Sequence, residues 1–338
     1  LSGPTLTADE AALFRASEPA GFILFARNIE HPAQLRALTD SLRDLTGREQ
    51  LPILIDQEGG RVARLGPPHW RSWPSAAALT DPTGAATESS LLRTAERVKC
   101  NYEALGLELA AAGVTVTCAP VLDLPQPDAH DVIGDRAFHT EPEPVAQMST
   151  AALEGLLDQG VLGVIKHMPG HGRAAADSHL ELPVVTTDAE TLYTRDFEAF
   201  KGIKGALMAM TAHVVYAAID SEHTATQSRD VIDGVIRGAI GFDGLLMTDD
   251  LSMQALEGSL RHRGERALAA GCELLMHCNG QMDEMVEVAH AAPDLSGRAR
   301  ERAGLALDAR HSPNVFDPAE GVTRLKALFA EGGVPLQS

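Results

Sequence analysis

Residues 166–179 hold an unusual density of side chains that transfer protons or donate hydrogen bonds. They read Lys-His-Met-Pro-Gly-His-Gly-Arg-Ala-Ala-Ala-Asp-Ser-His, so histidines, a lysine, an arginine and an aspartate share one loop with glycine and proline. A turn needs glycine and proline, but it does not need so many titratable groups. We therefore predict that this loop carries catalytic residues.

Within this loop, Asp177 and His179 have the spacing of an acid/base pair. Residues two apart in an extended segment project to the same side, so the Asp177 carboxylate can accept the far N–H of the imidazole. Such a bond selects one tautomer and raises the imidazole pKa toward a value that is useful at neutral pH. The pair is therefore a candidate proton donor and acceptor.

Residues 56–64, Asp-Gln-Glu-Gly-Gly-Arg-Val-Ala-Arg, form a second candidate group. Gly59 and Gly60 permit a tight turn. The Asp56 carboxylate can accept two hydrogen bonds from neighbouring hydroxyls, as the edge of a sugar ring requires, and Arg64 donates as a planar fork. The alternative is that Asp56 pairs with Arg61 or Arg64 only to order the loop.

The elements that must position these groups are apolar runs that alternate with helical patterns. The alternation predicts a parallel sheet with helices outside it, in a single α/β domain built as one (β/α)8 TIM-type barrel with a C-terminal helical extension. We expect the domain to span residues 1–338, with a catalytic core of about residues 20–290; no run identifies the eighth strand. The predicted strands are 21–25, 51–55, 114–119, 161–165, 206–211, 245–248 and 273–277.

Helix starts are also visible in the sequence. Thr7 with Glu10, Thr140 with Glu143, and the pair at 187 and 190 each fit the capping box, in which two side chains satisfy backbone donors. Polar residues follow nearly every predicted strand. The carboxyl ends of barrel strands form one rim, so we expect a shared polar site there. These strand-end groups are Arg27–Asn28, Asp56–Glu58, Asp123, Lys166–His167, His213 and Asp249–Asp250.

Composition excludes several functions. The chain has 338 residues and a net charge of −19, which repels nucleic acid and anionic membrane surfaces. The longest stretch without Asp, Glu, Lys or Arg, residues 205–219, contains His213 and is too short and polar to span a bilayer. No signal peptide is visible in a chain that starts at Leu1.

The cysteines show no disulfide pattern for a chain of this length, and their spacing is wrong for a zinc site. We expect them to be small apolar residues in a reducing cytoplasm. The protein is therefore expected to be a cytoplasmic monomer that uses neither nucleic acid nor membrane as a partner. The residues are Cys100, Cys118, Cys272 and Cys278.

Four motifs together resemble the β-N-acetylglucosaminidases of glycoside hydrolase family 3. They are the loop 166–179, the segment 56–61, Gly134-Asp-Arg-Ala-Phe138 and Met247-Thr-Asp-Asp-Leu251, and the likeness runs in order from about residue 20 to 280. The long histidine motif is very specific, whereas the shorter motifs support one another. Met168 stands where the family usually has Phe.

The resemblance implies a barrel that hydrolyses terminal β-linked N-acetylglucosamine with retention and, in bacteria, recycles cell-wall fragments such as muropeptides in the cytoplasm. It implies that Asp249 is the nucleophile, because the family's nucleophile directly follows the Ser or Thr that ends this strand, while Asp250 is expected to cap a helix. His179 is the implied acid/base, held by Asp177. No cofactor or metal is implied. The implied sugar-binding residues are Asp56, Arg64, Arg136, Lys166 and His167, the last two as donors to hydroxyls of the non-reducing sugar.

Some roles remain open at this point. Asp123 and His213 match rim positions, but Asp123 could equally brace the structure, and His171 could equally order its loop or contact substrate. The β-glucosidase branch of the family lacks the Asp-Ser-His element and takes a Glu from a second domain. A neutral imidazole base would also admit an anionic acceptor such as phosphate, which leaves a glycoside phosphorylase as an alternative.

Two further classes of protein are possible. A metal-dependent barrel hydrolase could use His167, His171, Asp177 and His179 as ligands, although the nearby positive charge of Lys166 opposes this. A barrel that only binds sugars would be expected to have lost a catalytic group, yet the groups named above are intact.

Overall fold

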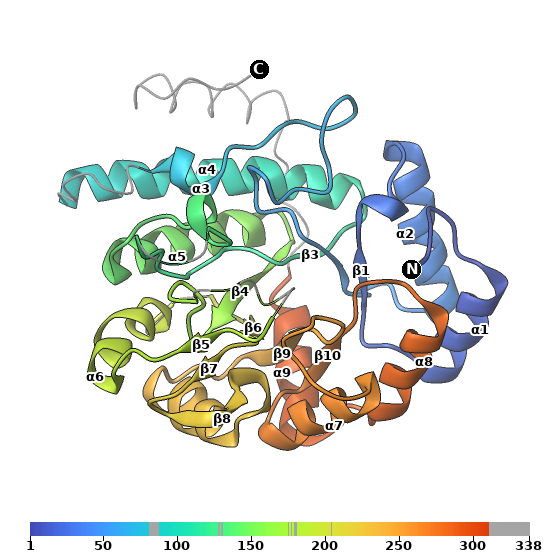
Figure 1. Cartoon of the computed structure of the whole chain (residues 1–338). Helices are drawn as coiled ribbons and strands as arrows, with labels where there is room; N and C mark the ends of the chain where they lie inside the picture. Colours follow the sequence, from blue (N-terminus) through green and yellow to red (C-terminus); the bar gives the residue numbers. More distant parts are fainter. Residues whose placement is uncertain are drawn as a thin grey trace.

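The computed structural model describes residues 1–80, 88–127, 129, 131–174, 176, 178, 181–203 and 205–310 (Figure 1). Asp177 and His179 lie outside the described residues. The part of the predicted C-terminal extension beyond residue 310 lies outside them as well.

A curled parallel sheet forms the centre of the molecule. Within the described ranges it has seven strands in chain order, and each pairs in parallel with the next. All seven predicted strands are therefore confirmed, and so is the barrel-type α/β fold. The strands are β1 (Phe22–Leu24), β2 (Ile53–Ile55), β3 (Val116–Thr117), β4 (Leu162–Met168), β6 (Met208–Thr211), β9 (Leu245–Asp250) and β10 (Leu274–Met276).

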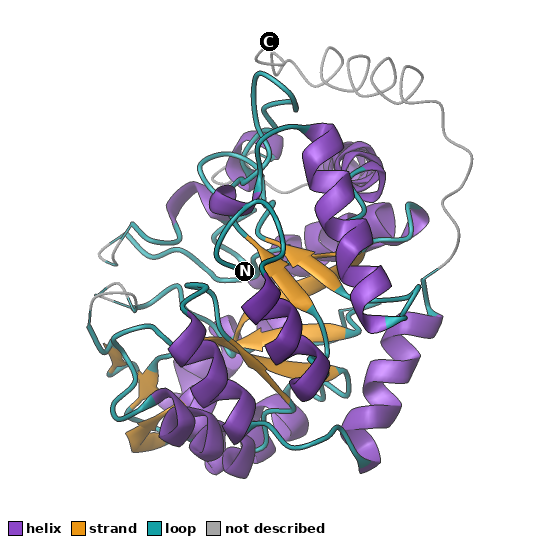
Figure 2. Ribbon diagram, turned by 90° about the vertical axis from the view of Figure 1, so that its right-hand side faces the viewer, coloured by secondary structure: helices purple, strands orange, loops and turns teal. Residues whose placement is uncertain are grey.

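Helices cover the outside of this sheet, as Figure 2 shows. The longest is α4 (Glu88–Ala111), which packs along α5 (Pro142–Asp158). The other α-helices are α1 (Ala8–Ser17), α2 (Pro32–Thr46), α3 (Ala76–Leu79), α6 (Ala189–Thr191), α7 (Leu260–Ala270), α8 (Met282–Ala291) and α9 (Gly297–Asp308). Shorter or wider helical turns are η1 (Ala26–Asn28), η2 (Gly134–Arg136), η3 (Leu192–Asp196), η4 (Glu198–Phe200), η5 (Ala225–Gln227) and η6 (Asp230–Ala239).

One of the three predicted capping boxes is confirmed. The Glu10 backbone N–H donates to Thr7 Oγ1 at 3.2 Å, and the Thr7 N–H donates to Glu10 Oε2 at 2.9 Å. The other two predictions, Thr140 and residue 187 as capping residues, were wrong by one position. Helix α5 starts at Pro142, whose ring suits the first helical position, and α6 is capped by Asp188.

Alternating side chains of the strands separate an inner from an outer core. In β2, Leu54 belongs to the cluster inside the barrel, whereas Ile53 and Ile55 pack outward against the helices. Ala303 and Ala306 of α9 pack against the inner cluster. Helix α9 therefore closes the end of the barrel from which the strands start, and the carboxyl ends are left for the site.

Residues after β1 and β10, the two edges of the sheet, are joined by hydrogen bonds. Arg27 Nε donates to the Leu1 carbonyl at 2.8 Å, and its Nη2 donates to the Cys278 carbonyl. Asn28 Nδ2 donates to the Leu1 and Gly3 carbonyls at 3.2 and 2.8 Å. Side chains therefore bridge the seam, and the eighth strand that the barrel prediction called for is not found among the described residues.

The structure adds a small second sheet that the sequence did not indicate. It pairs β5 (Val184–Val185) in parallel with β7 (Val215–Tyr216), and β7 in antiparallel with β8 (Asp220–Thr224). None of the four cysteines forms a disulfide, and three of them are buried. No helix in the described ranges has the length and apolar character needed to cross a membrane.

Candidate active site

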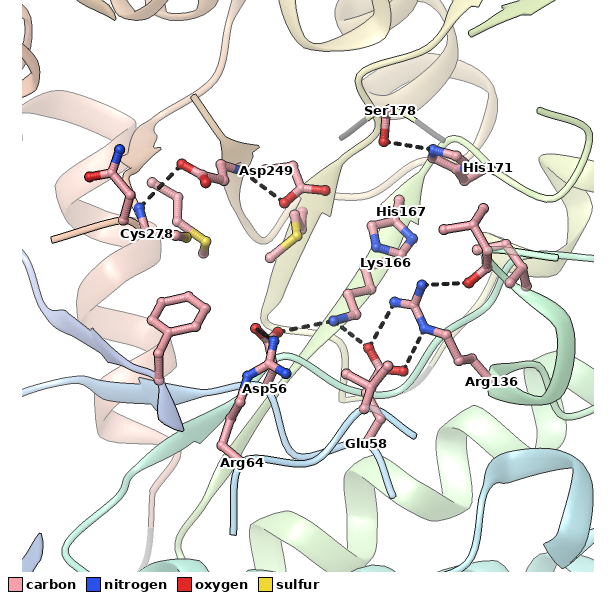
Figure 3. A pocket seen from close by; sticks show the side chains of 18 of the residues that line it. Asp56, Glu58, Arg64, Arg136, Lys166, His167, His171, Ser178, Asp249 and Cys278 are labelled. Carbon is pink, nitrogen blue, oxygen red and sulfur yellow. Dashed lines mark hydrogen bonds and ion pairs between the residues drawn. The ribbon is translucent and has the colours of Figure 1, made fainter. Parts of the chain in front are cut away.

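A cavity of about 350 Å³ opens at the carboxyl ends of the strands (Figure 3). This volume lies at the small end of the range for pockets that bind small molecules. Residues at the carboxyl ends of β4, β6, β9 and β10, or in the segments after β1, β2, β3, β4 and β10, line it. Its polar lining consists of Arg27, Asp56, Glu58, Arg64, Arg136, Lys166, His167, His171, Ser178, Asp249, Asp250 and Asn279.

One wall of this cavity is a chain of alternating charges. Arg136 holds Glu58 with two hydrogen bonds, at 2.8 and 2.9 Å, and Lys166 Nζ lies 2.6 Å from Glu58 Oε1. Lys166 also reaches Asp56 Oδ1 at 3.3 Å, and Asp56 Oδ2 pairs with Arg64 at 3.1 Å. These ion pairs therefore join residues that lie more than a hundred positions apart in the sequence.

These contacts determine the ionisation of the buried members. Burial alone would raise the pKa of Glu58, but Lys166 and Arg136 outweigh it and lower this pKa to about 2. Burial would likewise lower the pKa of Lys166, yet the carboxylates of Glu58 and Asp56 raise it above its ordinary value. Glu58 is therefore an anion and Lys166 a cation at any physiological pH.

The segment 57–64 folds back on itself to present this wall. The Gln57 side chain accepts the Arg64 and Leu65 N–H groups at 2.8 and 3.0 Å, and it donates to the Leu65 carbonyl at 2.9 Å. Gly59 and Gly60 have φ values of 98° and 57°, which favour glycine. The expected tight turn is confirmed.

Arg61 does not pair with Asp56. Its Nη2 donates to the carbonyls of Asp131, Val132 and Ile133 at 2.5, 3.1 and 3.2 Å, and its Nε lies 2.9 Å from Asp135. Arg61 thus fastens the loop that carries Arg136. Of the two loop-ordering pairs considered for Asp56, only the one with Arg64 exists.

The start of the histidine loop is anchored from several sides. Asp123, which is fully buried, accepts N–H bonds from His167 and His171. Tyr216 Oη donates to the Gly170 carbonyl at 2.6 Å, and Arg173 Nε donates to Asp196 at 2.7 Å. Asp123 therefore braces the loop, and it does not line the cavity.

His171 combines loop-ordering contacts with a place in the cavity wall. Its backbone N–H donates to Asp123 at 2.6 Å, and its Nε2 lies 3.1 Å from Ser178 Oγ. Its Nδ1 is buried and has no hydrogen-bond partner among the described residues. Ser178 also lines the cavity, which places the residue between Asp177 and His179 at the site.

The two adjacent carboxylates at the end of β9 differ in their contacts. Asp250 accepts hydrogen bonds from the Ser252 N–H and hydroxyl, at 3.0 and 2.5 Å, and from the Cys278 N–H at 3.2 Å. Residues 251–254 form turns, so Asp250 stabilises a turn and not the helix we expected. Within the described ranges, Asp249 accepts only the Asp250 N–H, at 2.8 Å.

The surroundings of Asp249 favour its charged form. Burial raises the pKa of this carboxyl, but its polar surroundings, among them the Asp250 N–H and the Lys166 ammonium group, outweigh burial and lower the pKa below its ordinary value. His213 is fully buried between Thr226 Oγ1, at 2.7 Å, and the Asp250 carbonyl, at 3.0 Å. His213 therefore supports the end of β9 from behind and lies outside the cavity wall.

The structure thus brings six of the predicted site residues to one cavity, while the positions of Asp177 and His179 lie outside the described residues. Sequence reasoning missed the role of Glu58, although it lies within a motif that was singled out. It also missed apolar residues of the cavity wall, whose only signal was their place at or just past a strand end. These apolar residues include Phe25, Met210, Met276 and Cys278. The six predicted site residues that line the cavity are Asp56, Arg64, Arg136, Lys166, His167 and Asp249.

The contacts of the two described histidines bear on the metal alternative. His167 Nδ1 faces Asp123, whereas His171 Nε2 faces Ser178, so these nitrogens have separate partners. Among the described residues, no three His, Cys, Asp or Glu side chains are grouped so that they could hold a metal ion.

Comparison with known proteins decides the family. The protein-family model described as "Glycosyl hydrolase family 3 N terminal domain" matches residues 5–300 of this chain. The chain belongs to glycoside hydrolase family 3. Among curated relatives, a "Beta-hexosaminidase" of Aromatoleum aromaticum is 36% identical over 94% of this chain and 88% of its own length. Another "Beta-hexosaminidase", from Alkalilimnicola ehrlichii, is 40% identical over 82% of this chain and 79% of its own.

Solved structures of this family agree with the fold. NagZ from Neisseria gonorrhoeae, in complex with N-trifluoroacetyl-D-glucosamine, matches with a TM-score of 0.82 and 29% identity, over 98% of this chain and 95% of that one. A beta-N-acetylhexosaminidase from Beutenbergia cavernae matches with a TM-score of 0.72 and 26% identity, over 96% and 94%. The chain is therefore a glycoside hydrolase, and its substrate is a carbohydrate.

Proposed function

We propose that this family 3 hydrolase is a retaining, exo-acting β-N-acetylhexosaminidase that releases terminal β-linked N-acetylglucosamine. The names of its relatives support this activity, and so does the N-acylated glucosamine named as the ligand of the gonococcal NagZ. The observation that carries the proposal is the cavity itself. Asp249 faces it from β9, and the charged wall of Asp56, Glu58 and Lys166 faces it from β2 and β4 (Figure 3).

The size and lining of the cavity suit one terminal sugar. A cavity near 350 Å³ has room for a monosaccharide unit. Lys166, Arg136 and Arg64 are donors, and Asp56 is an acceptor, so together they match a ring that carries several hydroxyls. Arg64 Nε is buried and has no hydrogen-bond partner within the described ranges.

The chemistry assigns a nucleophile and a proton carrier. Asp249 attacks the anomeric carbon as a carboxylate, and the low pKa of this group favours the form that attacks. His179, held by Asp177, protonates the departing oxygen and then deprotonates the water that hydrolyses the glycosyl-enzyme. Ser178, the residue between them, lines the same cavity.

The cellular setting that we propose follows from the family resemblance of the motifs. The natural substrates are then peptidoglycan fragments of the muropeptide type or related glycosides, and the enzyme acts in the cytoplasm as a monomer. We also propose that residues 1–338 form one domain, because one curled sheet takes strands from most of the described chain and the family match covers residues 5–300.

Hydrolysis of a panel of β-linked nitrophenyl sugars, with and without the N-acetyl group, tests the proposal. We expect the N-acetylglucosaminide to be preferred and the first product, followed by NMR, to retain the β configuration. Faster hydrolysis of the glucoside, or an inverted product, would contradict it. Adding phosphate to the same assay separates a hydrolase from a phosphorylase by the product formed.

A further inference from the structure

We propose that Glu58 is a positioning residue that holds Lys166 and Arg136 in place. By taking the closer contact with Lys166, it limits Asp56 to a longer one, so the remaining lone pairs of Asp56 can accept hydrogen bonds from the sugar. This inference rests on the proposed function only in assigning sugar binding to Asp56, Lys166 and Arg136. Glu58 itself acts through these neighbours.

Glu58 occupies the deep end of the charged wall. The exposed fraction of the side chain is 4% for Glu58 and Lys166, 12% for Arg136 and 16% for Asp56. Both oxygens of Glu58 bond to Arg136, and Oε1 also bonds to Lys166. Glu58 is therefore surrounded by cations, while Asp56 lies nearer the mouth, where a hydroxyl can reach it.

Lys166 lies between two carboxylates and is closer to one of them. Its Nζ is 2.6 Å from Glu58 and 3.3 Å from Asp56. If Glu58 were neutral, Asp56 would be the remaining carboxylate in contact with this buried ammonium group, and the two would draw together. That shift would shorten the existing 3.3 Å contact with Asp56 Oδ1 and remove a Lys166 N–H from the cavity. The charge of Glu58 prevents both changes.

The backbone of Glu58 is held independently of these side chains. Its N–H donates to the Val62 carbonyl at 2.9 Å, and its carbonyl accepts the Tyr102 hydroxyl at 3.4 Å. The adjacent turn at Gly59 and Gly60 packs against Pro74 and Ser75. Glu58 is thus a fixed point from which Lys166 and Arg136 are placed.

The charge balance leads to the same conclusion. Within this wall, Arg64, Arg136 and Lys166 carry three positive charges against the two of Asp56 and Glu58. Asp249, in the same cavity, adds a third negative charge, and a neutral sugar brings none. Without Glu58, three cations would share Asp56. The pKa of Lys166 would then fall, since Glu58 is the main charge that raises it.

The first variant is Glu58→Gln, with Glu273→Gln as the matched control. Glu273 is also a largely buried carboxylate between two cations, Arg237 at 2.9 Å and Arg302 at 2.6 Å, but it lies at the opposite end of the barrel. We expect Glu58→Gln to raise KM by about 10- to 100-fold, with a smaller change in kcat. Glu273→Gln should leave KM unchanged, whatever it does to Tm.

Glu58→Gln should also alter two properties that a general loss of stability would not. The KM of Glu58→Gln should rise further at alkaline pH, where the wild type keeps its KM, because Lys166 loses its proton more easily in the variant. Analogues that lack one ring hydroxyl at a time should lose less affinity, relative to the parent sugar, than they do with the wild type. Lys166 and Asp56 would then be paired more tightly with each other than they are in the wild type.

The second variant, Glu58→Ala, provides a rescue test. It removes the carboxylate and leaves space next to Lys166 and Arg136, so added formate should lower KM again. An equal concentration of chloride should have less effect, and the wild type and Glu273→Gln should not respond to formate. Recovery by formate supports the proposal even if Glu58→Gln folds poorly.

All variants are compared on the aryl glycoside that the wild type hydrolyses fastest. An enzyme that preferred a sugar without the N-acetyl group would contradict the proposed function and leave the Glu58 comparison valid. Wild-type KM and hydroxyl selectivity in folded Glu58→Gln would overturn the role of Glu58. Folded Glu58→Ala with a raised KM that formate does not lower would overturn it as well.

Discussion

Asp123 Oδ2 lies 2.6 Å from His167 Nδ1, in a fully buried contact. The other oxygen, Oδ1, accepts the backbone N–H groups of His167 and His171 at 3.2 and 2.6 Å. Burial raises the pKa of Asp123, but its backbone partners are donors, which suits a carboxylate. We therefore assign the proton of His167 to Nδ1, which leaves the lone pair on Nε2.

This tautomer changes the expected contribution of His167. Burial, reinforced by the charge of Arg136, lowers the pKa of the imidazole well below its ordinary value, so the ring is neutral. We infer that His167 accepts a hydrogen bond from a sugar hydroxyl, where the sequence alone had suggested a donor. Lys166, the preceding residue, remains a hydrogen-bond donor. The two neighbouring residues therefore offer the sugar one acceptor and one donor.

The first prediction concerns Asp123→Asn. An amide supplies only one acceptor oxygen and turns a donor toward some of the N–H groups, so His167 should lose its orientation. We expect kcat/KM to fall by about 10- to 100-fold, as for the loss of a buried hydrogen bond to a charged group. Steady-state kinetics and Tm measure the two effects.

Glu10→Gln is the control for Asp123→Asn. Glu10 is a buried carboxylate that accepts the Ser2 and Thr7 N–H groups at 2.7 and 2.9 Å, and it is not among the residues that line the cavity. The Glu10→Gln variant should have a lower Tm than the wild type and an unchanged kcat/KM. Equal kcat/KM in the wild type and folded Asp123→Asn would contradict the role of Asp123.

The second prediction separates Asp249 from Asp250. Asp249→Asn should lose several orders of magnitude in kcat, at about 1.4 kcal/mol per factor of ten, while folding and sugar binding persist. Asp250→Asn should lose much less, because its carboxylate bonds to Ser252 and Cys278. A 2-fluoro sugar with a good leaving group, followed by mass spectrometry, should label Asp249. A label on Asp250 or Asp56 would refute the assignment.

The third prediction concerns His179 as the proton donor. A dinitrophenyl group leaves nearly unaided, whereas an alcohol needs a proton. His179→Ala should therefore reduce the hydrolysis of poorly activated substrates far more than that of activated ones, and Asp177→Asn should do the same more mildly. A leaving-group series measured for all three enzymes tests this. Equal losses across the series would exclude His179 as the acid.

The same variant reports on the second chemical step. Water needs a base to attack the glycosyl-enzyme, but azide does not, so azide should accelerate turnover of His179→Ala and yield the glycosyl azide. Product analysis by mass spectrometry detects it. If azide left the turnover rate of His179→Ala unchanged and only the hydrolysis product formed, His179 would not be the base.

The fourth prediction is that catalysis survives exhaustive chelation. The proposed steps use side chains only, so kcat/KM should be the same before and after treatment with a strong chelator. Elemental analysis of the treated protein controls for incomplete removal. Activity lost to the chelator and restored by zinc or manganese would favour the metal-dependent alternative.

The fifth prediction links Glu58 to acid stability. Its pKa is about 2 in the folded protein, against an ordinary value of 4.5. The ion pairs of Glu58 therefore stabilise the fold fully above pH 4.5, and this contribution is lost as the pH falls toward 2. The free energy of unfolding of the wild type, relative to Glu58→Gln, should shrink by about 3 kcal/mol across that range.

Urea unfolding at pH 6 and at pH 3 measures most of this difference, about 2 kcal/mol, because Glu58 is only partly protonated in the folded protein at pH 3. Glu273→Gln provides the comparison, since the pH dependence assigned to Glu58 should persist in it. A gap between the wild type and Glu58→Gln that stays constant over the range would contradict the low pKa.

Local patterns in the sequence were sufficient for the main sheet. Each of the seven strands is a short apolar run, and the side chains of parallel strands bury on both faces, so the run itself is the signal. Because the carboxyl ends of such strands meet at one edge, Asp56, Lys166 and Asp249 were correctly placed together. The small sheet was missed because β5 and β7 are two residues long and have no pattern of their own.

By itself, the sequence determined which chemical groups the rim offers and in which order the strands carry them. Only the tertiary structure decided the partners of those groups: that Lys166 lies nearer Glu58 than Asp56, that Arg61 fastens the loop of Arg136, and that Asp123 orients His167. The physical reason is distance along the chain. Strand propensity acts between neighbours in sequence, whereas an ion pair or a tautomer depends on differences of a few tenths of an ångström between segments that only packing brings together.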